Sequence, residues 1–187
     1  MKQRLLKCLH IDFVDAPVHR FQSNTDMLVM IALLSAIAAI LQSMGGFLPG
    51  IGYAISPFST AAIFLANWLF PKRGILAYLL TIVLLWIIQP SELVVFPFTT
   101  GILGVVLGLS MHFLKNRLII VFLSGAGLTM GIQFVLSVLR FPLLGPVAET
   151  SFSLHVFVYI FIFSIVYSWV WLEASFFFMK KYIRRKK

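Results

Sequence analysis

The sequence predicts an all-α integral membrane protein with six transmembrane helices and both termini in the cytoplasm. Three observations lead to this prediction: an unusually apolar composition, six separate apolar runs, and an uneven distribution of basic residues. The chain has 187 residues, of which 60% are hydrophobic and 11% are charged, whereas soluble domains have about 45–50% and about 25%. A soluble globule of this size would expose a large apolar surface, so a soluble fold is excluded.

Each apolar run approaches the length of about 20 residues that crosses about 30 Å of hydrocarbon. The expected spans are residues 27–45, 53–70, 74–89, 93–114, 118–139 and 153–179. The second and third runs are short enough to form a re-entrant pair instead. However, the break Pro71-Lys72-Arg73 between them makes a poor turn in the middle of a bilayer. We therefore expect six crossings.

The basic residues give the orientation. With both termini inside, 14 of the 15 lysines and arginines lie in cytoplasmic segments, and only Arg140 lies outside, as the positive-inside rule requires. Residues 1–26 then form a basic cytoplasmic segment that can fold as an interfacial helix. Residues 27–179 form the membrane domain, and residues 180–187 a basic cytoplasmic tail. The net charge of +9 is a topology signal here, and no nucleic-acid partner is expected.

The chain offers little chemistry for catalysis. It lacks the His-Glu-x-x-His, Gly-x-Ser-x-Gly, Walker and dinucleotide-binding patterns. Its single cysteine, Cys8, allows no internal disulfide. We therefore expect no enzyme activity, no catalytic residue, no metal site and no cofactor. Ser124 is interpreted as part of a small-residue packing face, and Glu173 as a boundary carboxylate that pairs with a lysine such as Lys180.

Polar residues gather toward the predicted outer ends of the spans, where hydrogen-bonding groups among aromatic side chains are typical of a small-molecule site. On the fifth span they lie at i, i+4 and i+7, which is one helix face, and there Arg140 is suited to an anionic ligand group. The alternatives are an ion pair of Arg140 with Glu92 or Glu149, and ordinary interfacial decoration. The candidate substrate-binding residues are Gln42, Tyr53, Trp86, Gln89, Thr99, Thr100, Gln133, Ser137, Arg140, His155 and Tyr159.

The first span carries the element Ala32-Leu33-Leu34-Ser35-Ala36, and a long glycine- and proline-containing outer loop, Met44–Ser56, follows it. With these features, its size and its six spans, the chain resembles the substrate-binding S components of energy-coupling factor (ECF) vitamin transporters. The resemblance lies in the size and helix arrangement of residues 27–187.

The resemblance implies a function without catalysis. The chain would capture a vitamin or similar micronutrient near the outer face and topple in the membrane to carry it inward. A transmembrane coupling protein and two ATPases would drive that movement. Ala32 and Ala36 would dock on the coupling protein, and Met44–Ser56 would act as a mobile lid.

Two rival interpretations remain. One is a membrane scaffold of cell-envelope morphogenesis or sporulation, which would need no ligand. The other is a small lipid-acting enzyme, for which His112, His155 and Glu173 are the candidate residues.

Overall fold

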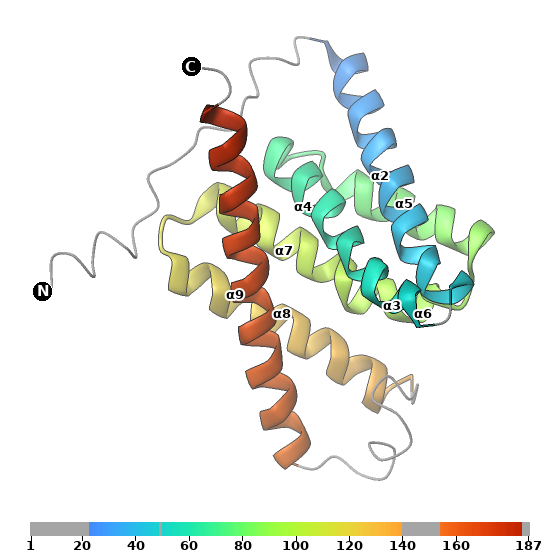
Figure 1. Ribbon diagram of the computed structural model, residues 1–187, viewed down its shortest axis with the longest axis vertical. Helices are drawn as coiled ribbons and strands as arrows, with labels where there is room; N and C mark the ends of the chain where they lie inside the picture. The colour runs from blue at the N-terminus through green and yellow to red at the C-terminus, as the bar shows by residue number, and fades with distance from the viewer. Residues whose placement is uncertain (1–22, 49, 140–153, 185–187) are drawn as a thin grey trace, which may run out of the picture.

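The computed structural model describes residues 23–48, 50–139 and 154–184, and these residues form an all-α bundle (Figure 1). Six α-helices exceed ten residues. They are α2 (Asn24–Phe47), α4 (Ser59–Leu69), α5 (Ile75–Ile88), α7 (Thr100–Phe113), α8 (Arg117–Ser137) and α9 (Leu154–Arg184). Short helices precede α4 and α7, namely α3 (Ile51–Ile55) with η2 (Ser56–Phe58), and α6 (Glu92–Val95) with η3 (Phe96–Phe98).

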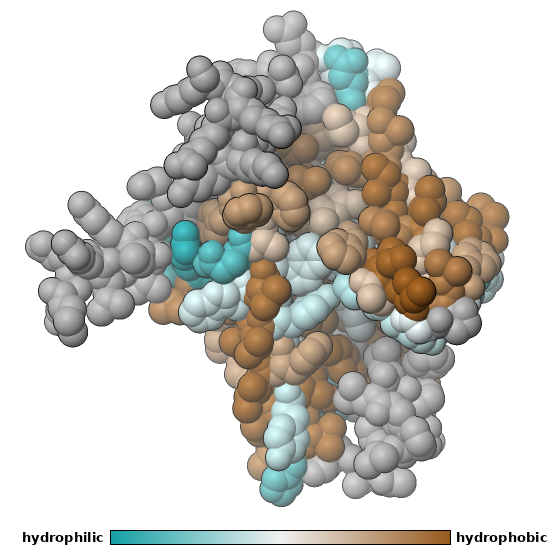
Figure 2. Space-filling view, in the orientation of Figure 1, coloured by the Kyte–Doolittle hydropathy of each residue, from teal (hydrophilic) through white to brown (hydrophobic). Residues whose placement is uncertain are grey.

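Four of the helical stretches are long and apolar enough to cross a membrane: Asn24–Phe47, Glu92–Phe113, Arg117–Ser137 and Leu154–Phe178. Apolar side chains cover much of the visible face (Figure 2). The fold is thus that of a multi-pass membrane protein with transmembrane helices. The expected second and third spans are shorter, because α4 has 11 residues and α5 has 14.

The expected loop Met44–Ser56 is largely helical, which corrects the sequence-based prediction. Helix α2 continues through Gly45 and Gly46 to Phe47, and α3 begins at Ile51. These two glycines do not end the helix. They allow neighbouring side chains to pack closely against it. A Cβ on Gly45 would lie 3.0 Å from Glu92 Oε1, and one on Gly46 would overlap the Gln89 side chain. The turn itself falls at Gly50, whose φ of +86° suits glycine.

Helix α4 lies between α2 and α7, while α5 packs on α2, α8 on α7, and α9 on α8. Close approach of α7 to α4 depends on two glycines one turn apart. A Cβ on Gly104 would lie 2.9 Å from the carbonyl oxygen of Thr60, and one on Gly108 would lie 2.7 Å from that of Phe64. Small residues of this kind let helix backbones approach in membrane bundles.

Polar contacts mark opposite ends of α2. Near its start, Arg73 Nη1 donates to Asn24 Oδ1 at 3.2 Å. Near its other end, Gln42 bonds to residues of α4, α6 and α7, and α3 and α6 lie there together (Figure 1). We call these the Arg73 end and the Gln42 end of the bundle.

Candidate functional site

A buried polar network lies at the Gln42 end and joins four separate elements. Its centre is the Gln42 side chain, which has no exposed surface. The Gln42 amide nitrogen donates to Glu92 Oε2 at 2.7 Å. Its carbonyl oxygen accepts from Ser59 Oγ at 2.7 Å and from Thr100 Oγ1 at 2.8 Å. Helices α2, α4, α6 and α7 therefore meet through one amide group.

This arrangement fixes the orientation of the Gln42 amide. A carboxylate only accepts hydrogen bonds, so the group that faces Glu92 must be the NH₂. Both lone pairs of the Gln42 carbonyl oxygen are then used by the two hydroxyls. Thr60 extends the network, because its hydroxyl donates to the Thr100 carbonyl oxygen at 3.2 Å. The result is a connected set of hydrogen bonds between side chains of four elements.

Glu92 is the acidic member of the network. Its side chain is only 9% exposed, and it has no ion-pair partner among the residues that the structure describes. Its Oε1 faces Gly45, as the 3.0 Å distance to a Cβ built there indicates. A carboxyl group placed like this in a membrane protein is a candidate functional group.

The structure brings two of the candidate binding residues, Gln42 and Thr100, into direct contact through the 2.8 Å hydrogen bond. Gln89 lies beside them at the Gln42 end, with its amide against Gly46 and a 3.0 Å hydrogen bond to Ser91 Oγ. The Thr99 hydroxyl is turned to its own chain and donates to the Val95 carbonyl oxygen at 2.7 Å.

The remaining candidates are placed apart from the network. Tyr53, Trp86 and Tyr159 are 71%, 69% and 72% exposed, and His155 is also exposed. Within the described ranges, no hydrogen bond or ring contact joins these four residues to Gln42. Such exposure near helix ends is typical of side chains at a membrane interface.

The expected polar face of the fifth span is present in part. Gln133 Nε2 donates to Ser137 Oγ at 2.7 Å on α8, as the i, i+4 spacing predicts. Arg140, the third member of that face, lies outside the described residues, as does Glu149.

Three network members are absent from the sequence-based set of binding residues: Ser59, Thr60 and Glu92. For Ser59, the sequence feature that could have suggested a binding role is its position at the start of a short apolar run. For Glu92, that feature is the small number of acidic residues in this chain. Neither signal could show that both side chains reach the same amide, 17 and 50 positions away along the chain.

The two alanines proposed for docking lie on the side of α2 that points away from the bundle. Ala32 is exposed and Ala36 is partly buried, whereas Ala38 and Ala39 are fully buried in the core. Ala32 therefore lies outside the packing that holds α2 to α4 and α5, and Ala36 lies at its edge.

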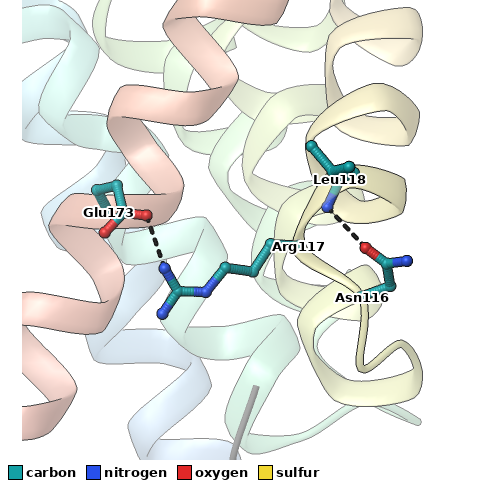
Figure 3. A network of polar contacts seen from close by, with 4 residues as sticks. All are labelled: Asn116, Arg117, Leu118 and Glu173. Carbon is teal, nitrogen blue, oxygen red and sulfur yellow. Dashed lines mark hydrogen bonds and ion pairs between the residues drawn. The ribbon is translucent and has the colours of Figure 1, made fainter. Parts of the chain in front are cut away.

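Glu173 pairs with Arg117 of α8 at 3.0 Å, so an arginine provides the contact for which a lysine was expected (Figure 3). The Arg117 guanidinium carbon also lies 4.7 Å from the centre of the Phe176 ring. Next to it, Asn116 Oδ1 accepts from the Leu118 backbone N–H at 3.0 Å and begins α8. The two contacts of Arg117 tie α8 to α9.

Ser124 is fully buried, and its Oγ has no hydrogen-bond partner among the described residues. A Cβ on the adjacent Gly125 would lie 2.6 Å from Ile165 of α9, in agreement with a packing role for this segment. The described residues also contain no group of three His, Cys, Asp or Glu side chains able to hold a metal ion.

Comparison with known protein families, with characterised proteins and with solved structures gives no match to this chain.

Proposed function

We propose that the chain is the substrate-capture subunit of an ATP-driven importer of a vitamin or similar micronutrient. The observation that carries this proposal is the Gln42 network. Four elements converge on one buried amide next to a carboxylate that lacks a counter-ion in the described part of the chain. Buried polar groups in a membrane domain are costly and are retained for function.

The proposal includes six crossings with both termini in the cytoplasm. The hairpin of α4 and α5 supports it, because Ser59 contacts Gln42 at one end and Arg73 contacts Asn24 at the other. Gln42 and Asn24 are 42 − 24 = 18 positions apart on α2, which at about 1.5 Å per residue is about 27 Å. That distance is close to the hydrocarbon thickness of about 30 Å, so the two polar contacts of the hairpin lie near the two ends of a crossing α2, although α4 and α5 have only 11 and 14 residues.

Energy for import would come from separate partners, a transmembrane coupling protein and two ATPase subunits. The resemblance to S components supports this part, together with the outward-facing Ala32 and partly buried Ala36 on α2. The network would hold the substrate at the outer face of the cell membrane. The segment after α2 would cover it, with Gly50 as the point of bending.

Native mass spectrometry of the gently solubilised protein from its own host tests the proposal. We expect a complex that contains one coupling protein and two ATPases, or a bound molecule of vitamin size. Co-purification with cell-wall or division proteins, and without any ligand, would instead favour a scaffold.

A further inference from the structure

Glu92 presents two carboxylate oxygens in different surroundings. Oε2 is anchored by the 2.7 Å hydrogen bond from Gln42, whose carbonyl oxygen is itself held by Ser59 and Thr100. Oε1 faces Gly45 and receives no hydrogen bond from the described residues. The network therefore fixes the carboxylate in place and leaves one oxygen available as an acceptor.

A buried carboxylate is unfavourable in an apolar environment unless a positive charge or hydrogen-bond donors compensate it. Gln42 supplies one donor, and the described residues supply no cation to Glu92. The rest of the compensation comes from water at the exposed 9% of the residue, or from a group outside the described part of the chain.

We propose that Glu92 recognises a positively charged group of a small organic ligand, such as a protonated amine or an N-alkylated aromatic ring. This inference rests on the proposed function, because it names the substrate class of the same site. A single carboxylate matches a single positive charge. A divalent ion such as Ca²⁺ or Mg²⁺ needs about six oxygen ligands, usually with several carboxylates, and the described residues contain no such cluster.

Three probes test the inference: benzylammonium, benzyl alcohol and benzoate, which share a ring and differ in charge. Each is added to the purified full-length protein in lipid nanodiscs, and the shift in Tm is measured. We expect benzylammonium alone to raise the Tm. The Glu92→Gln variant should lose that shift, and Glu92→Asp should keep part of it.

Glu173→Gln is the matched control, since it removes the same charge from a carboxylate that is paired with Arg117. Its response to benzylammonium should equal that of the unaltered protein, each shift being taken relative to the variant's own Tm. Equal shifts from all three probes, or an unchanged shift in Glu92→Gln, would overturn the inference. A shift that appears only in Arg140→Gln would also overturn it, because Arg140 would then be the counter-ion of Glu92.

The outcome is independent of the partner experiment. Recovery of the coupling protein and ATPases without charge selectivity would reject the substrate class and keep the importer. Charge selectivity with neither those partners nor a bound molecule of vitamin size would keep the site and reject the importer.

Discussion

The side-chain amide of Gln42 donates a 2.7 Å hydrogen bond to Glu92 across 50 positions of chain. The bond joins the last third of α2 to the short helix α6, which precedes α7. Because Ser59 and Thr100 bind the same amide from α4 and α7, a single side chain sets how four elements meet. Stability and ligand binding at this end of the bundle should therefore both depend on Gln42.

Gln42→Ala should lower the free energy of unfolding by about 2 kcal/mol, since it leaves two hydroxyls and a carboxylate without their partner. Membrane hydrogen bonds average only about 0.6 kcal/mol each, but three are lost here together. Denaturant titration in mixed micelles measures the change. Gln133→Ala is the control, because it removes an amide that makes one bond, to Ser137. Equal losses in the two variants would argue against a special role for the network.

Gly131→Ala should destabilise the protein by about 1–3 kcal/mol, as overpacking typically does. A Cβ at this position would overlap the carbonyl oxygen of Phe98 in η3, and a backbone group cannot rotate away. Gly127→Ala, one turn earlier on α8, is the comparison, because its nearest neighbour is the Val106 side chain at 3.3 Å. In thermal unfolding, the Tm of Gly131→Ala should be well below that of Gly127→Ala. The reverse order of the two Tm values would contradict this packing of α8.

Single cysteines distinguish six crossings from four. In a Cys8→Ser background, Lys72→Cys and Ser91→Cys each place a cysteine at an exposed position. If α4 and α5 cross, a membrane-impermeant maleimide added to intact cells should label residue 91 and not residue 72. If only the four long helices cross, the two positions lie on the same side. Labelling of both from outside would therefore disprove six crossings, and permeabilised cells provide the control for reactivity.

Glu173→Gln should change the free energy of unfolding by less than about 1 kcal/mol. The Glu173 and Arg117 side chains are 47% and 35% exposed, and ion pairs with such exposure contribute little. Arg117 also keeps its contact with the Phe176 ring. The same variant tests the enzyme alternative in cells, since an essential catalytic carboxylate would abolish function. Loss of function at unchanged expression would favour that alternative.

The helices could be predicted from the sequence because apolar runs and their breaks are local features. The expected fourth, fifth and sixth spans differ by one or two residues at each end from the long apolar stretches Glu92–Phe113, Arg117–Ser137 and Leu154–Phe178. The path after α2 could not be predicted in this way. Gly45 and Gly46 are compatible with a loop until their neighbours Glu92 and Gln89 are known, and these lie more than 40 positions further along the chain.

From the sequence, only the end of the bundle at which the site lies could be predicted. The sequence placed Gln42 and Thr100 at the same end of the bundle, and the structure joins them directly. It could not separate these residues from Tyr53, Trp86 and Tyr159, which are exposed. In helices that are apolar all round, a polar residue at a helix end gives no indication of the direction it faces.

Replacement of both Ala32 and Ala36 by leucine should prevent assembly with the coupling protein while leaving the free energy of unfolding unchanged. Ala32 is exposed and Ala36 partly buried, so larger side chains there meet lipid in the isolated protein and block only a partner that approaches closely. Co-purification of the ATPase module measures assembly, and binding of the probe ligand measures the site. The matched control is Ala38→Leu with Ala39→Leu, because both of these alanines are fully buried. The control should unfold the bundle and lose ligand binding together with assembly. If the Ala32 and Ala36 variant also unfolds, then this face packs inside the protein. If it assembles normally, the coupling protein docks elsewhere.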